Sequence, residues 1–248
     1  MSKPTTPKQR KPKKPLVKPR GRPPRNERDF AAIRSAEDNA LRQRILAAAA
    51  DVFAERGFAS ASIDEVARQL GATKGLVYHR YRSKGELLAD LCAEGLEALN
   101  AQLEAIADRP MPAISRLTDA ATSHASDVVN RIGLHRTLAE AFSGRAAALL
   151  PASEQQAIAA FAAQRKGYEA IFTRLIVEAT QQHDLPGGRD TAMITRIFIS
   201  TLDAPLRWPT DMLDQLAEKS QLIARQLSYF AMRGAGASDT TLTQEFSR

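Results

Sequence analysis

Apolar residues recur at intervals of three and four along the chain from Asn39 onward, and this helical period constrains the fold more than any other feature. No run with the alternating period of a strand is visible. Glycine and proline divide the chain into separate segments. Helices are expected at about residues 39–56, 63–70, 74–80, 84–108, 113–130, 133–149, 153–182, 190–204 and 210–233. The sequence therefore predicts an all-α protein of about nine helices.

Basic residues are concentrated in the first 34 positions. This segment holds 12 Lys and Arg against 2 Asp and Glu, whereas the whole chain holds 35 and 28, so the remainder is slightly acidic. Basic arms of this kind usually bind nucleic acid or anionic surfaces. The single cysteine, Cys92, excludes a disulfide framework, and no stretch approaches the roughly 18 apolar residues of a membrane span. We therefore expect a cytoplasmic protein with no membrane partner.

The arm contains a short motif with its own DNA-binding interpretation. In the run Lys18-Pro19-Arg20-Gly21-Arg22-Pro23-Pro24-Arg25, the prolines favour an extended path and Gly21 allows close approach to a surface. Arg20 and Arg22 would then lie in a narrow minor groove. The segment resembles an AT-hook. The alternative is a solvated basic tail that raises DNA affinity without selecting a sequence.

A helix, a glycine-containing turn and a short polar helix follow one another between residues 62 and 80. Ser62 and Glu65 form a capping box, Gly71 ends the first helix and Thr73 precedes the second. The second helix gains little from burial, so its side chains are available to a partner. Residues 42–88, RQRILAAAADVFAERGFASASIDEVARQLGATKGLVYHRYRSKGELL, resemble the DNA-binding domain of TetR-family transcriptional regulators.

This resemblance implies DNA-contacting roles position by position. The start of the recognition helix would reach base edges, whereas residues at helix N-termini would contact phosphates. The residues concerned are Ser62, Thr73, Lys74, Gly75, Leu76, Tyr78, His79 and Lys84. Val77 is expected in the core. Gly85 departs from the Glu that is usual in the family, and we expect it to loosen the joint between the two domains.

The final long segment carries apolar residues in alternating steps of three and four, a seam that favours helix–helix packing. TetR-family proteins dimerise through their last two helices, so the resemblance implies a dimer interface here. Its expected residues are Leu213, Leu216, Ile223, Leu227 and Phe230. The alternative is packing within the chain's own core.

A ligand site is expected among the apolar residues of the second domain. Residues 160–209 resemble the C-terminal domain of TetR regulators of steroid and fatty-acid catabolism, in which an Arg-Trp pair closes the penultimate helix and coenzyme A thioesters are inducers. The expected ligand residues are Phe142, Tyr168, Phe172, Phe198, Arg207 and Trp208. The alternative is that the aromatic residues are core and that Arg207-Trp208 is a contact at the dimer seam.

These expectations combine into a homodimeric repressor that a small-molecule inducer, such as an acyl-CoA, releases from a palindromic operator. We expect no cofactor, no metal site and no catalysis, because enzyme motifs are missing and the four histidines are scattered in sequence. Two alternatives are an architectural protein of AT-rich DNA and an efflux-type repressor that senses hydrophobic drugs, for which Asp203, Glu140 and Glu169 are candidate acids. The expected divisions are a disordered arm, a helix-turn-helix domain, a ligand-binding and dimerisation domain and a disordered tail, at residues 1–37, 38–84, 85–233 and 234–248.

Overall fold

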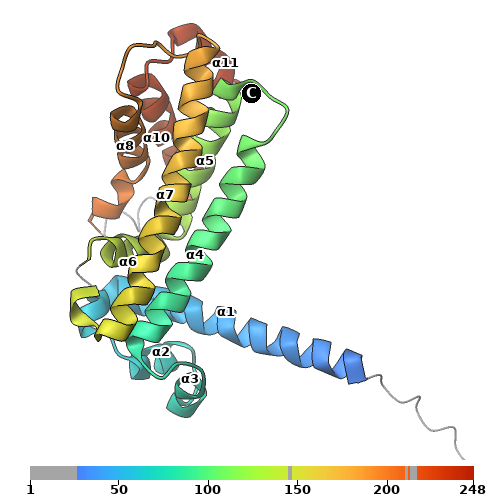
Figure 1. Ribbon diagram of the computed structural model, residues 1–248, viewed down its shortest axis with the longest axis vertical. Coiled ribbons are helices and arrows are strands. Elements are labelled where there is room, and N and C mark those ends of the chain that lie inside the picture. Colours follow the sequence, from blue (N-terminus) through green and yellow to red (C-terminus); the bar gives the residue numbers. More distant parts are fainter. Residues whose placement is uncertain (1–26, 145–146, 210–211, 213–216) are drawn as a thin grey trace, which may run out of the picture. The chain divides into compact units, whose positions relative to one another are not determined.

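A computed structural model describes residues 27–144, 147–209, 212 and 217–248, and every element in these ranges is helical (Figure 1). The all-α prediction is confirmed. The chain divides into two compact units, residues 1–40 and 41–248. The expected domain boundary after residue 84 falls inside the second unit, at the start of a long helix.

The first four helices contain the expected helix-turn-helix. They are α1 (Glu27–Ser60), α2 (Ile63–Gln69), α3 (Lys74–Arg80) and α4 (Lys84–Ala107). Gly57 interrupts α1 with a positive φ of 72°, which L side chains rarely adopt, so the break expected there is confirmed. The arm was expected to extend to residue 37, but α1 already begins at Glu27. The sequence has no proline between Pro24 and Pro110, and the residues of α1 include many good helix formers.

The remaining helices follow the expected segments closely in most places. They are α5 (Ala113–Asn130), α6 (Ile132–Phe142), α7 (Ala152–Gln181), α8 (Thr191–Leu202), α10 (Ser220–Gly234) and α11 (Asp239–Phe246), with 3-10 turns at Ala147–Leu149, Ala204–Arg207 and Ala217–Lys219. The segment expected at 133–149 ends early, at Phe142. None of the described helices is long and apolar enough to cross a membrane.

The expected disorder of residues 234–248 is wrong, because this segment contains α11. The Ser238 hydroxyl accepts a hydrogen bond from the Thr241 amide at 3.1 Å and so caps the helix. Leu242 is only 2% exposed, and Phe246 packs at the edge of the same core. Two apolar residues one turn apart thus dock a segment whose composition is otherwise polar.

The core of residues 41–248 is continuous from the helix-turn-helix to α10. Within it α5 packs along α10, and α4 packs along α7 (Figure 1). Phe172 of α7 lies at the centre of an aromatic group and contacts the rings of His124, Tyr168 and Phe198. The helix-turn-helix therefore shares one core with α4, α6 and α7.

Candidate DNA-binding surface and ligand cavity

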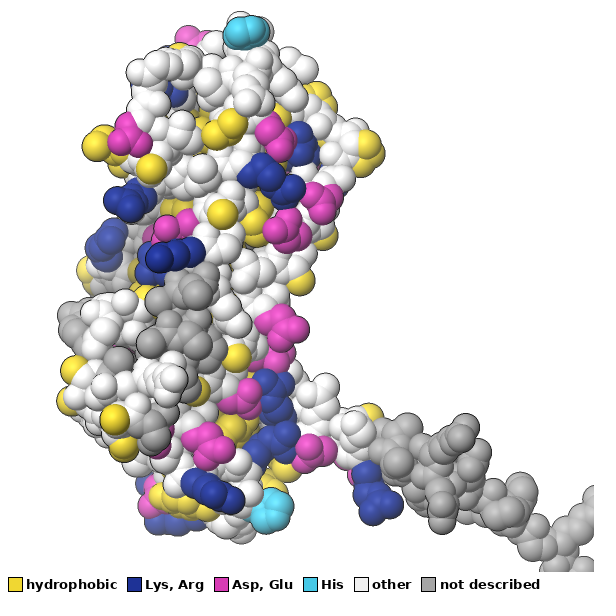
Figure 2. Space-filling view, in the orientation of Figure 1, with side chains coloured by type: hydrophobic (Ala, Val, Ile, Leu, Met, Phe, Trp, Pro, Cys, Tyr) yellow, Lys and Arg dark blue, Asp and Glu magenta, His cyan; other side chains and the backbone are white. Residues whose placement is uncertain are grey.

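The short helix α3 presents nearly all of its side chains to solvent. Val77 is fully buried and anchors the helix, as expected, while Leu76 and Tyr78 are 39% and 48% exposed. The other recognition-helix residues are exposed too, namely Thr73, Lys74, Gly75 and His79. Lys, Arg and His side chains lie among acidic ones on the surface around α2 and α3 (Figure 2). The helix is therefore held by one buried residue and can be inserted into a groove without rearrangement.

The polar contacts of α3 are few and exposed. The Lys74 ammonium pairs with the Asp64 carboxylate of α2, and its side chain is 67% exposed. Such a pair contributes little stability in water and can be exchanged for a phosphate or a base. A Cβ built on Gly75 would meet nothing within 4 Å, so no packing inside the chain requires a glycine there. Gly75 thus gives a partner access to the helix backbone.

Ser62 fulfils the capping prediction completely. Its hydroxyl accepts a hydrogen bond from the Glu65 amide at 3.3 Å, and its own amide donates to Glu65 Oε2 at 3.0 Å. The hydroxyl also donates to Glu65 Oε2 at 2.9 Å, and this hydrogen bond lowers the pKa of Glu65. A phosphate bound at this N-terminus would therefore compete with the Glu65 carboxylate for Ser62.

Lys84 has a role that its sequence position does not reveal. Its ammonium donates to the carbonyl oxygens of Phe58, Ala59 and Ala61 at 2.6, 3.0 and 2.9 Å, which accounts for all three of its N–H donors. It also lies 4.5 Å from the centre of the Phe58 ring. Lys84 thus caps the last turn of α1, where helix carbonyls carry partial negative charge. A phosphate contact would require it to release one of these carbonyls.

An ion-pair group that local sequence patterns do not predict joins α1 to α4. The Arg42 guanidinium binds both oxygens of Asp90, at 2.8 and 2.6 Å, and Glu94 at 2.7 Å. The Tyr81 hydroxyl donates to Asp90 at 2.6 Å. Burial opposes ionisation of Asp90, but hydrogen bonds from Arg42 and Tyr81 outweigh it and lower the pKa of the carboxyl. This group fixes the helix-turn-helix on the start of α4.

Gly85 tightens the joint that it was expected to loosen. It is buried where the N-terminus of α7 meets the N-terminus of α4, and a Cβ there would overlap the Glu154 carboxylate and lie 2.7 Å from Leu150 Cδ2. Glu154 Oε1 accepts a hydrogen bond from the Ser83 hydroxyl at 2.7 Å. The missing side chain therefore allows α7 to contact the loop that follows the recognition helix.

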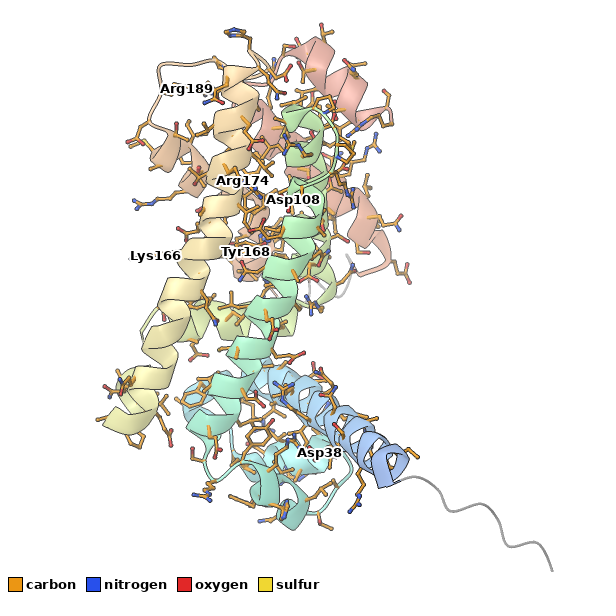
Figure 3. All side chains as sticks on the ribbon, turned by 45° about the vertical axis from the view of Figure 1, so that its right-hand side comes forward. Asp38, Asp108, Lys166, Tyr168, Arg174 and Arg189 are labelled. Atoms are coloured by element: carbon orange, nitrogen blue, oxygen red, sulfur yellow. The ribbon has the colours of Figure 1, made fainter. Side chains whose placement is uncertain are left out.

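A small cavity of about 80 Å³ lies among α4, α5, α6, α7 and α8. Its apolar lining comes from Leu96, Leu99, Leu138, Ala139, Phe142, Ile199 and Leu206, and its polar lining from His124, His135, Arg165, Tyr168, Glu169 and Asp203. Tyr168 lies on the side of α7 that faces α4, whereas Lys166 lies on the opposite side (Figure 3). Pockets for drug-sized ligands usually measure about 300–1,000 Å³, so this cavity must enlarge to admit one.

Two buried histidines organise the polar side of the cavity. His124 Nδ1 is hydrogen-bonded to the Tyr168 hydroxyl, and its Nε2 lies 3.0 Å from Asp203 Oδ1. His135 Nε2 lies 2.7 Å from Asp127 Oδ2, and the two histidine rings meet edge to face at 5.8 Å. The four histidines are scattered in sequence, but the fold brings these two together.

Burial and pairing set the charges of this group. Burial lowers the pKa of His135 despite its hydrogen bond to Asp127, so the ring is neutral near pH 7. Burial also opposes ionisation of Asp203, but the hydrogen bond from His124 outweighs it and lowers the pKa of the carboxyl. Desolvation raises the pKa of Tyr168 well above its ordinary value, so its hydroxyl stays protonated. The polar groups that line the cavity thus satisfy one another.

Only part of the expected ligand set lines this cavity. Phe142 and Tyr168 do, whereas Phe172 and Phe198 lie in the core behind it, at 0% and 2% exposure. Arg207 is exposed, and neither it nor Trp208 lines the cavity. Trp208 packs against the core at the end of the 3-10 turn Ala204–Arg207, and its carbonyl accepts a hydrogen bond from Arg136 at 2.7 Å. The kink at Pro205 turns Leu206, rather than the Arg-Trp pair, toward the cavity.

The expected dimer-interface residues likewise include both buried and exposed side chains. Ile223 and Leu227 are each 8% exposed and belong to the core of their own chain, so the intrachain alternative holds for them. Phe230, on another side of α10, is 62% exposed. Leu213, Leu216, Arg20 and Arg22 lie outside the described residues.

The described residues offer little chemistry beyond hydrogen bonding. Within these ranges no group of three or more His, Cys, Asp and Glu could hold a metal ion. Burial raises the pKa of Cys92 to about 12, which keeps this thiol protonated and unreactive. The described residues thus form an exposed polar helix and a hydrogen-bonded cavity.

Comparison with known proteins agrees with this arrangement. Residues 45–91 match the family model of bacterial regulatory proteins of the tetR family. The transcriptional regulator SrpR of Pseudomonas putida is 41% identical over 59 residues, an alignment that spans 24% of this chain and 28% of that protein.

Solved structures extend the similarity over most of the chain. The ketosteroid transcriptional regulator KstR2 of Mycobacterium tuberculosis superposes with a TM-score of 0.63 at 20% identity, over 80% of this chain and 95% of that one. FadR of Bacillus subtilis, solved in complex with stearoyl-CoA, superposes with a TM-score of 0.57 at 19% identity, over 77% and 98%. Residues 45–91 thus match the tetR family of bacterial regulatory proteins, and the chain has the all-helical fold of the regulators with which it superposes.

Proposed function

We propose that the protein is a ligand-responsive transcriptional regulator that binds operator DNA as a homodimer and acts as a repressor. The observation that carries this proposal is the helix α3, which exposes Lys74, Tyr78 and His79 while a single residue, Val77, holds it in place. A helix with this distribution loses little free energy when its polar face enters a major groove. Its agreement with the tetR family model supports the assignment.

The proposed dimer interface is the outer face of α8 and α10. Five large hydrophobic side chains are exposed on the described parts of these adjacent helices: Met193 and Ile197 at 58% and 56% on α8, and Leu222, Tyr229 and Phe230 at 55%, 41% and 62% on α10. Exposed apolar side chains on neighbouring helices are typical of a surface that a partner covers. A second copy would also supply the second recognition helix, which an operator with two half-sites requires.

The proposed inducer site is the cavity between α6 and α7, enlarged on binding. The wall that we propose to move is one of two helices. It is α7, which touches the loop after the recognition helix through Glu154 and Ser83, or α6, whose Glu140 accepts a hydrogen bond from the Phe58 amide at 3.2 Å. Either movement alters the position of the helix-turn-helix, so inducer and DNA would favour different arrangements of the same chain.

An acyl-CoA is the inducer class we propose. The stearoyl-CoA that Bacillus subtilis FadR binds on a similar fold supports it. The apolar lining around Leu138 and Phe142 suits an acyl chain, and Arg165 at the mouth suits a phosphate or carboxyl oxygen. Arg165 now pairs with Glu169 at 3.1 Å and lies 5.1 Å from the centre of the Phe142 ring, so both contacts would have to give way.

The arm that carries Arg20 and Arg22 is proposed to add DNA affinity. Its charge would strengthen binding to phosphates in a salt-dependent way, and the Arg-Gly-Arg motif would favour A·T-rich flanks.

Selection of binding sites from random duplexes tests the proposal. We expect the full-length protein to enrich an inverted repeat whose half-site centres lie about 10 base pairs apart, or a multiple of that spacing, because each half-site takes one recognition helix. Deleting residues 1–34 should lower affinity but leave the repeat unchanged. Enrichment of AT-rich DNA without a repeat would instead favour the architectural alternative and contradict our proposal.

A variant of the dimer face completes this test. Phe230→Asp places a charge on the proposed interface without touching the core, since the side chain is 62% exposed. We expect it to sediment as a monomer and to bind the repeat much more weakly. Gln221→Asp serves as a charge-matched control, because Gln221 is exposed on α10 but the helical period places it on a different side from Leu222 and Phe230. A dimer that survives Phe230→Asp would contradict this interface.

A further inference from the structure

A second hollow, larger than the inducer cavity, lies where α1, α4 and α6 meet. It measures about 370 Å³ and is open on one side. Its floor is formed by small and aliphatic side chains from all three helices, among them Leu46, Ala50, Leu91 and Leu134. We call it the α1–α4–α6 groove. Its volume falls in the range of small-molecule sites without any rearrangement of the helices.

Close helix contacts hold the groove open. A Cβ on Gly133 would lie 3.3 Å from Ala54 Cβ and 3.5 Å from the Ala50 carbonyl, so α6 touches α1 directly at this glycine. A Cβ on Gly95 would lie 3.1 Å from Leu134 Cδ1, so α6 is also tight against α4. These two contacts lie at the groove, and the lining residues Ala47 and Ala98 have short side chains that do not fill it. The groove is therefore a fixed feature of packing.

The charged groups of the lining are neutralised except at one position. Arg131 binds Asp127 at 2.6 Å, and Glu94 accepts hydrogen bonds from Arg42 and Gln43 at 2.7 and 2.8 Å. Asp51, on the α1 wall, has no ion pair among the residues that the structure describes. Burial and the charge of nearby Glu55 raise the pKa of Asp51, even though Gln69 donates a hydrogen bond to it. A cation beside Asp51 would relieve this unfavourable environment.

We propose that the α1–α4–α6 groove binds an organic monocation with an apolar body. The cationic group would lie beside Asp51, and the apolar body would cover Leu46, Leu91 and Leu134. An anion would meet Asp51 and Glu94 without a free basic partner, because Arg131 is already paired. This site is separate from the inducer cavity and does not depend on the proposed function.

Binding here would also act on the helix-turn-helix. The occupant would touch α1 on one wall and α4 and α6 on the others. It would thus stabilise the present contact of Gly133 with Ala50 and Ala54, and with it the packing of α1 on the body. The expected consequence is a higher thermal midpoint in the presence of the cation.

Isothermal titration calorimetry of the full-length protein with benzyltrimethylammonium tests the proposal. We expect saturable binding of one cation per chain, and none of the anion phenylacetate, which offers a similar ring. Asp51→Asn should weaken binding about tenfold, because a charge pair near the surface is exchanged for a dipole. Asp51→Glu should retain most of the affinity.

Two matched substitutions locate the site. Ala98 and Ala139 are exposed alanines on the walls of the groove and of the inducer cavity, respectively. Ala98→Phe should fill the groove and abolish binding, while Ala139→Phe should leave it unchanged. Thermal melts establish that each variant is folded. If Asp51→Asn does not fold, the loss or retention of binding in Ala98→Phe tests the proposal instead.

Several results would overturn the proposal. They are a wild type that shows no saturable binding, phenylacetate binding as well as the cation, or undiminished affinity in Ala98→Phe. Loss of binding in Ala139→Phe but not in Ala98→Phe would assign the cation to the inducer cavity instead.

Discussion

The recognition helix and the inducer cavity differ in where their polar side chains lie. On α3 most polar side chains are exposed and Lys74 pairs with Asp64 at the surface, whereas around the cavity His124 and His135 are buried and hydrogen-bonded to Tyr168, Asp203 and Asp127. The first arrangement is ready for a partner as it stands. The second is complete without one, so a ligand has to replace contacts that already exist.

This difference indicates how the two sites would be coupled. In our proposal α3 reads DNA without rearranging, so it can be moved as a rigid piece, and its movement is what a ligand would control. In our proposal a ligand that enlarges the cavity would displace α6 or α7, because both helices line it. The contacts of Glu140 with Phe58 and of Glu154 with Ser83 are the links between them.

The largest expected effect is a difference in stability between substitutions in the core beside the cavity and substitutions on α3. Phe172→Ala should lower the free energy of unfolding by about 3–5 kcal/mol, because it opens a hole among His124, Tyr168 and Phe198. Tyr78→Ala removes an aromatic side chain that is 48% exposed and should change stability by about 0.5 kcal/mol or less. Urea unfolding followed by circular dichroism measures both. Equal losses of unfolding free energy in Phe172→Ala and Tyr78→Ala would contradict the difference between the two regions.

A smaller effect is expected at the joint between α4 and α7. Gly85→Ala should destabilise the protein by about 1–3 kcal/mol, because the new methyl group displaces Glu154 from Ser83. Gly167→Ala is the matched control on α7, where a Cβ meets nothing within 4 Å. If α7 carries the inducer signal, Gly85→Ala should also weaken the response of operator binding to inducer. If Gly85→Ala responds to inducer like the wild type, the contact of Glu154 with Ser83 does not carry the signal.

The smallest effect concerns pH. The pKa of Asp203 is lower in the folded chain than its ordinary value of 3.8, so its ionised form contributes stability above pH 3.8. This contribution is lost as the pH falls through the lower, folded-state pKa. The groups that face Asp203 are His124, Tyr168, His135 and Arg165.

Asp203→Asn checks this sign. The variant should be less stable than the wild type at pH 7, and the difference should shrink as the pH falls below 3.8, because the wild type then loses its ionised carboxylate. Unfolding in urea at several pH values measures the difference. A gap that widens toward acid would mean that the folded chain favours the protonated carboxyl.

Local patterns in the sequence predict the helix-turn-helix well. The break at Gly57, the capping box of Ser62 and the burial of Val77 each depend on residues within one or two turns. The cavity is different, because His124, His135, Tyr168 and Asp203 come from separate elements and only packing brings them together.

Helical periodicity also leaves the partner of an apolar face undetermined. Ile223 and Leu227 share a face of α10 that the chain buries itself, while Phe230 faces outward, although all three belong to one regular seam. The helix α11 was missed for a related reason. Its docking depends on Leu242 and Phe246 reaching a core that the local sequence does not reveal.

Fluorescence anisotropy of the selected operator duplex tests the central claim that α3 reads DNA. The double variant Lys74→Ala/Tyr78→Ala should lose at least about thirtyfold in affinity, since two contacts of roughly 1–3 kcal/mol each are removed. Its thermal midpoint and oligomeric state should not change, and Lys166→Ala, on an exposed part of α7, should bind like the wild type. Undiminished operator binding by the folded double variant would contradict the account.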